Sequence, residues 1–259
     1  MIIERQCDIE PEVGAIITAM TDAEKPFIYD TIRAVLSDTL IGQAVLCIEE
    51  KNSWIDSVIG SFMTDPRLEL IRMPLVPLGA VRNQALKYIK KPWVTYCDGD
   101  DVWCQGKTMN QLDYASVTGA DFVGSDHYLT NEKGDIRALS PARYIPVPSS
   151  WMVKTEIMRQ HSFIETPYSI RSEDDEWWIR TYKSVNKVRC PKMLVKYRVR
   201  DNSLSSATIS KRRKARIVSL GNIPVLGAFF LLLTWCIWVL TRNDKYVWYK
   251  GWNPIESTD

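Results

Sequence analysis

The sequence is poor in the residues that build redox centres and zinc sites. Its 259 residues include six cysteines, none in a CxxC pair, and the two histidines, His127 and His161, share no zinc-type spacing with them. We therefore expect reduced thiols in a cytosolic compartment and structural histidines. A net charge of +2 is too small to favour nucleic-acid binding through bulk charge, so we expect no nucleic-acid partner. The polar, acidic start MIIERQCDIEPE predicts no signal peptide.

Charge is missing from one long stretch, residues 217–241, and within it residues 225–240 are apolar except for Thr234. At about 1.5 Å per helical residue, this stretch is long enough to reach across a hydrocarbon core of about 30 Å. The basic run KRRKAR (residues 211–216) precedes it and favours a cytoplasmic or anionic lipid surface. We expect the chain to associate with a membrane surface or bilayer, with its main domain on the cytoplasmic side. The alternative is a buried or interfacial helix that begins at Pro224.

Short apolar segments of strand type alternate with segments of helical periodicity along the first half of the chain. Strands are expected at residues 13–20, 43–50, 68–74 and 93–101. This alternation predicts an α/β fold, with a mixed, mainly parallel, Rossmann-like sheet flanked by helices. We assign this domain to residues 1–210. Residues 211–259 would hold the basic run, a hydrophobic membrane helix at about 217–241 and a short aromatic tail.

Three of the expected strands end in polar or acidic residues. Thr18 closes the first, Glu49 and Glu50 close the second, and the turn Asp98–Gly99–Asp100 closes the fourth. Ligands of such sheets bind outside the carboxyl ends of the strands, which predicts a polar cleft at this edge. Gly99 allows a tight turn, and two carboxylates aimed to one side would suit Mg²⁺ or Mn²⁺. A solvated acidic turn is the alternative.

The segment VRNQALKYIKKPWVTYCDGDDVW resembles the core of family 2 glycosyltransferases, which have the GT-A fold. The resemblance rests on an Arg-Asn-x-Ala-Leu helix followed by a strand and an Asp-x-Asp-Asp turn, here Arg82, Asn83, Ala85 and Leu86, then Asp98, Asp100 and Asp101. SEDDEWWIR resembles the Glu-Asp helix start of that family, and YRVRDNSLS resembles its closing segment. The resemblance covers residues 11 to 206 roughly. It implies inverting transfer of a sugar from a nucleotide-diphosphate sugar to a hydroxyl acceptor.

The resemblance also implies roles for individual residues. Asp98 and Asp100 would bind Mn²⁺ or Mg²⁺ and, with Gly99, the donor; Asp174, beside Glu173, would be the catalytic base. A capped, solvated helix start is the alternative for the last two. The loop of Thr18, Ala19 and Met20 would pack on the base and ribose. The acid that closes the second strand would contact uracil, although this chain has Glu49 and Glu50 where the family usually has aspartate.

Two arginines and three tryptophans complete the expected site. By the resemblance, Arg82 would face the nucleotide or its phosphates; a surface salt bridge is the alternative. Arg200 stands where many members have histidine, and a guanidinium can clamp the diphosphate but cannot ligate a metal. Trp151, Trp177 and Trp178 could form an acceptor-binding platform, with packing in the core as the alternative.

The resulting hypothesis is a membrane-associated hexosyltransferase that uses a UDP-sugar in glycan or glycolipid biosynthesis. Two alternatives stay open. A metal-dependent nucleotidyltransferase or a sugar hydrolase could use the same turn, but ITAMTDAEKP lacks the glycines of a phosphate loop. A catalytically inactive, membrane-anchored nucleotide-binding or scaffold module is the second alternative.

Overall fold

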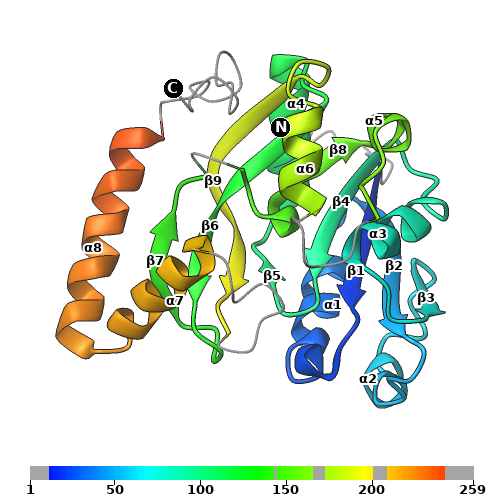
Figure 1. Ribbon diagram of the computed structural model, residues 1–259, viewed down its shortest axis with the longest axis horizontal. Coiled ribbons are helices and arrows are strands. Elements are labelled where there is room, and N and C mark those ends of the chain that lie inside the picture. Colours follow the sequence, from blue (N-terminus) through cyan, green and yellow to red (C-terminus); the bar gives the residue numbers. More distant parts are fainter. Residues whose placement is uncertain (1–11, 143–144, 166–172, 201–208, 243–259) are drawn as a thin grey trace, which may run out of the picture.

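The computed structural model describes residues 12–142, 145–165, 173–200 and 209–242. Within these residues nine strands form one sheet in the order β3-β2-β1-β4-β8-β6-β9-β5, and β7 pairs with β6 (Figure 1). The strands are β1 Val13–Ala19, β2 Ile41–Glu49, β3 Leu68–Met73, β4 Trp93–Asp98, β5 Val102–Trp103, β6 Phe122–Thr130, β7 Ile136–Ser140, β8 Met152–Lys154 and β9 Lys187–Arg198. The helices are α1 Ile28–Leu36, α2 Ile55–Ile59, α3 Leu78–Leu86, α4 Lys107–Thr118, α5 Thr155–Gln160, α6 Glu173–Arg180, α7 Ile209–Gly221 and α8 Pro224–Thr241.

The first four strands of the order are parallel, which confirms the α/β fold expected from the sequence. Strand β8 runs antiparallel to β4 and β6, so the complete sheet is mixed. In the register of the central pair, Thr18 of β1 lies beside Asp98 of β4. The carboxyl ends of β1, β2 and β4 therefore meet at one edge, as a parallel sheet requires.

Strand β1 is apolar on both faces because both faces of the sheet are covered. Ala15 and Ile17 pack with Ile28 and Ile32 of α1 in one apolar cluster. Ile16 points to the other face, where it packs in a cluster that also holds residues of α3 and α6. Side chains of a strand alternate between faces, so a continuous apolar run such as VGAIITA is what a doubly covered central strand needs.

The C-terminal hydrophobic stretch forms two helices rather than the single helix expected over residues 217–241. Helix α7 ends at Gly221 and α8 begins at Pro224, whose ring occupies the first turn, where a backbone N–H would have no partner. Helix α8 has a mean hydropathy of 2.0, and 6% of it is buried. Its length and composition would allow it to cross a membrane. Helix α7 runs across residues 210 and 211, the predicted domain boundary.

The cysteines agree with the expectation of free thiols in the part of the chain that the structure describes. Cys47, Cys97 and Cys190 are buried, and Cys104 and Cys236 are also unpaired. Burial raises the pKa of the Cys47 thiol to about 12, so this side chain behaves as a small apolar residue.

Candidate active site

The acidic turn after β4 is held against the end of β1. The hydroxyl of Thr18 donates to Oδ1 of Asp98 at 3.1 Å, and the Gly99 amide donates to the Thr18 carbonyl at 2.8 Å. A Cβ at position 99 would lie 2.9 Å from that carbonyl oxygen and 2.9 Å from Cβ of Ala19. Glycine is therefore required at this position by close approach of two backbones rather than by an unusual φ.

Asp101 holds the turn in place through hydrogen bonds to its carboxylate. Its carboxylate is fully buried and accepts from the Ser149 hydroxyl at 2.6 Å and from the Arg198 amide at 2.9 Å. Burial raises the pKa of Asp101, and the neighbouring charges of Asp100 and Asp98 add to the rise. This third aspartate thus ties the turn to β9, and it is not available to a ligand.

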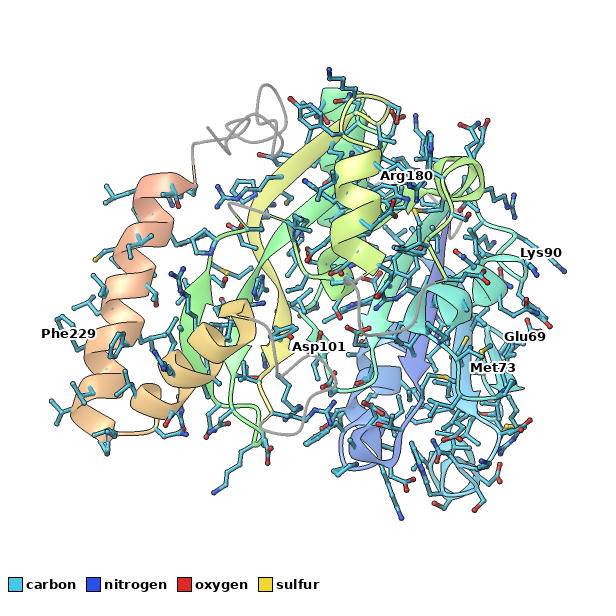
Figure 2. The ribbon with its side chains drawn as sticks, viewed as in Figure 1. Glu69, Met73, Lys90, Asp101, Arg180 and Phe229 are labelled. Atoms are coloured by element: carbon cyan, nitrogen blue, oxygen red, sulfur yellow. The ribbon has the colours of Figure 1, made fainter. Side chains whose placement is uncertain are left out.

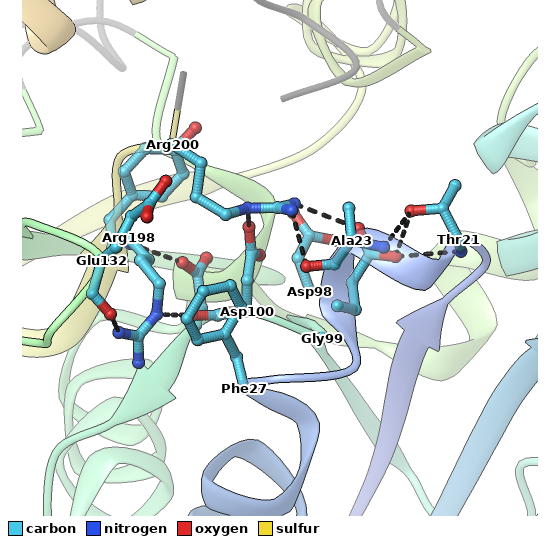
Figure 3. A network of polar contacts seen from close by, with 12 residues as sticks. Thr21, Ala23, Phe27, Asp98, Gly99, Asp100, Glu132, Arg198 and Arg200 are labelled. Atoms are coloured by element: carbon cyan, nitrogen blue, oxygen red, sulfur yellow. Dashed lines mark hydrogen bonds and ion pairs between the residues drawn. The ribbon is translucent and has the colours of Figure 1, made fainter. Parts of the chain in front are cut away.

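Arg200 lies over the turn and neutralises Asp100 (Figure 3). Its Nε is 2.6 Å from Oδ2 of Asp100, and its Nη2 is 3.1 Å from Oε1 of Glu24. Burial raises the pKa of Asp100 to about 6, while the Arg200 charge opposes the rise. Arg200 is therefore at the site that the sequence predicted, and there it contacts two carboxylates.

Glu24 is a site residue that the sequence reasoning did not identify. It reaches Arg200 because its other carboxylate oxygen accepts from the Thr21 amide at 2.9 Å and from the Thr21 hydroxyl at 2.5 Å. This arrangement is a capping box at the start of a short 3₁₀ helix, Asp22–Glu24. The Thr-x-x-Glu pattern was the available signal.

Arg82 connects the acidic turn to the start of α6. Its side chain is 1% exposed; Nη2 lies 2.8 Å from Oδ1 of Asp98, and Nη1 donates to the carboxylate of Glu173. Burial opposes the charge of the guanidinium, but the carboxylates of Asp98, Glu173 and Asp174 outweigh it and raise the pKa of Arg82. Arg82 therefore forms a buried ion-pair network, and the surface salt bridge considered for it is wrong.

The two acids at the start of α6 have different surroundings. Glu173 is largely buried; desolvation raises its pKa, and Arg82 opposes that rise. Asp174 is half-buried, and within the described residues no hydrogen bond or ion pair to its carboxylate is present. Its charge nevertheless acts on Arg82 and on Tyr197, which places Asp174 at the same site as the acidic turn. Among the described residues, Arg82 therefore bonds directly to Glu173 and interacts with Asp174 only through its charge.

The residues expected to bind the nucleotide differ in whether their side chains or only their backbone atoms are accessible to a ligand. Ala19 and Met20 are 0% and 2% exposed because their side chains point into the two apolar layers, so only their backbone can reach a ligand. Glu49 closes β2 and is half-buried, and Glu50 is exposed. Because Ile48 lies beside Ala19 in the parallel register, both glutamates lie at the same edge as Thr18.

The acceptor platform expected from three tryptophans is contradicted by their burial. Trp151, Trp177 and Trp178 are 0%, 0% and 2% exposed. The rings of Trp151 and Trp177 are 5.2 Å apart, and the indole N–H groups of these two donate to the carbonyls of Pro146 and His161. Packing of the core, the alternative stated for them, is their role here. Any acceptor must be bound by other residues.

Asp98 and Asp100 fit a metal that is shared with substrate rather than one held by protein alone. Within the described residues, no group of three or more His, Cys, Asp or Glu is placed to hold an ion. Asp98 and Asp100 expose 29% and 14% of their side chains, and Asp101 is withdrawn. Mg²⁺ and similar hard cations often take one or two protein carboxylates and complete their coordination with phosphate oxygens.

An acidic turn lies at the carboxyl edge of the mixed sheet, and the acidic start of α6 lies beside it. This combination is typical of the GT-A fold of nucleotide-sugar-dependent enzymes. Residues 17–184 match the Glycosyl transferase family 2 family, and the chain belongs to this family. The resemblance noted in the sequence is thereby confirmed. A comparison with curated protein sequences found no significant match.

Solved structures support the fold. S. aureus TarS 1–349 in complex with UDP-GlcNAc is similar with a TM-score of 0.61 and 13% identity, covering 83% of this chain and 66% of that one. The mannosyltransferase PcManGT from Pyrobaculum calidifontis, in complex with GDP-Man and Mn²⁺, gives a TM-score of 0.59 and 14% identity, covering 76% and 59%. The chain thus spans slightly less than two thirds of these structures, and at such identities the likeness establishes the fold alone.

Proposed function

We propose that this family 2 glycosyltransferase moves a hexose from a UDP-sugar to a hydroxyl acceptor with inversion. The observation that carries the proposal is the Arg82 bridge, which joins Asp98 in the acidic turn to Glu173 at the start of α6. The bridge fixes the proposed donor-binding carboxylates relative to the proposed base. Catalysis of group transfer depends on this kind of fixed positioning.

The proposed base is Asp174. A single displacement at the anomeric carbon requires a group that takes the proton of the acceptor hydroxyl. Glu173 is occupied by Arg82, whereas the carboxylate of Asp174 accepts no hydrogen bond from the described residues. This difference favours Asp174 over its neighbour for the role.

Asp98 and Asp100 would hold Mn²⁺ or Mg²⁺ together with the donor diphosphate. A bound divalent cation would neutralise the charge of the leaving diphosphate. Arg200, with its guanidinium 2.6 Å from Asp100, is placed to contact the same diphosphate once the donor is present. The Mn²⁺ in the mannosyltransferase complex is consistent with this assignment.

The nucleotide would lie over the ends of β1 and β2, with Thr18 and the backbone of Ala19 and Met20 beneath it. Glu49 or Glu50 would accept a hydrogen bond from the base. The similar structures carry UDP-GlcNAc in one case and GDP-Man in the other. We favour UDP because the family resemblance places the acid that closes β2 against the ring N–H of uracil. Guanine also has a ring N–H, so the donor screen must include GDP-sugars.

The acceptor would be a lipid-linked or surface glycan, since the apolar helix α8 is suited to a membrane and the catalytic residues lie in the same chain. We propose a membrane-associated enzyme with a cytoplasmic catalytic domain in residues 1–210 and a membrane-binding part in residues 211–259.

The test is a donor screen with detergent-solubilised full-length protein, Mn²⁺ and an extract of bacterial lipids and glycans as acceptor. Release of UDP from one UDP-sugar, lost in Asp174→Asn, supports the proposal. Release of GDP from GDP-mannose alone would overturn the nucleotide assignment. Pyrophosphate formed from a nucleoside triphosphate and a sugar phosphate would instead indicate a nucleotidyltransferase, and absence of turnover with every donor would favour the inactive binding module.

A further inference from the structure

Helix α8 lies along the sheet instead of projecting away from it. Figure 1 shows α8 running beside β7 at one side of the molecule. Three polar contacts tie its second half to the sheet. The Leu139 amide donates to the hydroxyl of Thr234 at 3.1 Å, Nε1 of Trp238 donates to Asp126 at 2.9 Å, and Nη1 of Arg189 donates to the Thr241 carbonyl at 3.0 Å.

Two of these contacts end on a buried ion pair. Asp126 and Arg189 are 0% and 1% exposed, and Nε and Nη2 of the arginine each lie 2.7 Å from a carboxylate oxygen. The pair is part of the sheet, because Asp126 belongs to β6 and Arg189 to β9. If α8 crossed a bilayer while docked in this way, β7, which contacts the helix at Thr234, would lie at the depth of the hydrocarbon, and the ion pair beside the last turn of the helix would lie at its boundary. Charged groups and sheet edges are costly there.

The face of α8 that points away from the sheet is apolar along its whole length. Val225, Phe229 and Leu240 are 82%, 59% and 79% exposed, and they span the helix from its first turn to its last. Figure 2 shows Phe229 on the side of α8 that faces away from the sheet. The exposed Arg213 and Arg216 lie on the adjacent helix α7. Such a basic helix beside an apolar face matches an anionic lipid surface.

The inner side of α8 also favours hydrocarbon as the surrounding medium. An open, mainly apolar groove of about 840 Å³ lies between the helix and the sheet, with Leu139, Met193 and Leu194 on one wall and Leu231, Leu232 and Trp235 on the other. Water in such a groove would have few hydrogen-bond partners, whereas lipid chains can fill it.

We propose that α8 does not cross the bilayer but lies in one leaflet, with its outer face in the hydrocarbon and the catalytic domain at the same membrane surface. The docking contacts hold the helix parallel to the sheet edge, and the exposed apolar side chains supply the membrane affinity. The inference rests on the proposed membrane association and is independent of the proposed sugar transfer.

Thiol accessibility at the two ends of the helix region tests this topology. The parent protein carries Cys7→Ser, Cys104→Ser and Cys236→Ser and keeps the buried Cys47, Cys97 and Cys190. One exposed cysteine at a time is then added by Ser219→Cys in α7, Arg242→Cys after α8, or Ser116→Cys in α4 as a marker of the catalytic side. Sealed membrane vesicles are treated with an impermeant maleimide before and after detergent. We expect all three cysteines to be labelled from the same side. Labelling of Arg242→Cys only from the side opposite to Ser116→Cys would overturn the proposal.

Vesicle flotation tests whether lipid is the occupant of the outer face. With vesicles of phosphatidylglycerol and phosphatidylcholine, we expect Phe229→Ser to bind about tenfold more weakly than the parent, because one large apolar side chain is lost from the hydrocarbon. Met63→Ser, at a position that is 68% exposed outside α7 and α8, is the matched control and should bind like the parent. Parent protein that stays with the aqueous fraction, or self-association through α8 in place of vesicle binding, would refute the lipid assignment. Neither measurement depends on transferase activity.

Discussion

Nη2 of Arg82 lies 2.8 Å from Oδ1 of Asp98, in a contact where only 1% of the arginine side chain is exposed. The same guanidinium donates to Glu173, which is 91 residues away in the sequence. A planar guanidinium can bond two carboxylates at once, and a lysine ammonium matches that geometry poorly. One buried side chain therefore links the acidic turn to the start of α6.

Arg82→Lys should lower kcat/KM by about a hundredfold or more, because a small displacement of the reacting groups is costly in group transfer. The measurement is steady-state transfer with the donor found in the screen. Arg33→Lys is the matched control, since Arg33 forms a solvent-exposed ion pair with Asp30, and it should leave kcat/KM unchanged. Normal kinetics in Arg82→Lys would show that the bridge does not position the site.

Arg82→Gln should also destabilise the fold, by about 3–5 kcal/mol, because it leaves the partly buried carboxylates of Asp98 and Glu173 without their buried cation. Urea unfolding of the two proteins at pH 7 measures the difference. A change below about 1 kcal/mol, the range of an exposed ion pair, would mean that the network contributes little to stability.

Asp174→Asn should bind donor normally and lose transfer by about 10²–10⁴-fold, the usual contribution of a general base. The amide has nearly the same shape but cannot take the acceptor proton. Asp175→Asn, at the next, exposed position of α6, is the control and should stay active. Full turnover by Asp174→Asn would exclude it as the base.

Asp100→Asn and Arg200→Ala should distinguish metal binding by Asp100 from diphosphate binding by Arg200. We expect Asp100→Asn to lose the Mn²⁺-dependent part of nucleotide affinity. Arg200→Ala should keep a response to Mn²⁺ but bind the diphosphate more weakly, since a guanidinium bonds phosphate and does not ligate metal. The readout is nucleotide binding with Mn²⁺ and with EDTA. An identical Mn²⁺ response in wild type and Asp100→Asn would contradict the metal assignment.

The burial of Lys107 should make the stability of the fold depend on pH. Its ammonium group is fully buried, donates to the Thr95 hydroxyl at 2.7 Å, and lies 4.2 Å from the centre of the Trp103 ring. Desolvation lowers its pKa to about 7. Between pH 7 and about pH 10.4, Lys107 is protonated in the unfolded chain and neutral in the folded chain. The contribution of Lys107 to stability therefore increases with pH across this window, and its cost is complete below pH 7.

Lys107→Met removes this titration. The stability advantage of the variant over wild type should shrink by about 1.4 kcal/mol for each pH unit above 7, because one proton is involved. Urea unfolding followed by tryptophan fluorescence at pH 7, 8 and 9 gives the difference. Lys90→Met, at an exposed position, should show a constant difference. A constant difference for Lys107→Met as well would mean that the buried ammonium keeps its ordinary pKa.

Local sequence patterns were sufficient to predict the family, the fold class and the acidic turn. The run VGAIITA predicts a strand covered on both faces, and β1 is such a strand. A turn at Gly99 was also expected, but the close approach to Thr18 and Ala19 that requires glycine there joins two strands and was not predictable from the local sequence. The strand and the turn themselves depend on periodicity and short-range sterics, which one sequence contains.

Long-range partners could not be predicted in the same way. The bridge from Arg82 to Glu173 and the contact of Arg200 with Glu24 join residues far apart in the chain, and one sequence has no signal for such pairs. The three tryptophans were misassigned for a different reason. Large aromatic residues occur both in ligand-binding surfaces and in hydrophobic cores, and only their burial in the structure distinguishes the two. A helix beginning at Pro224 was the alternative stated from the sequence, and α8 does begin there. The single helix over residues 217–241 was expected because this whole stretch lacks charge.

Calorimetric binding of UDP, with and without Mn²⁺, to the wild-type protein and to Asp100→Asn would show whether the acidic turn forms a metal-dependent nucleotide site. GDP and CDP serve as competing nucleotides. The account predicts that UDP binds wild type more tightly than GDP or CDP, that Mn²⁺ strengthens this binding, and that Asp100→Asn loses the Mn²⁺ effect. Absence of binding by any nucleotide diphosphate, in the presence or absence of Mn²⁺, would contradict it.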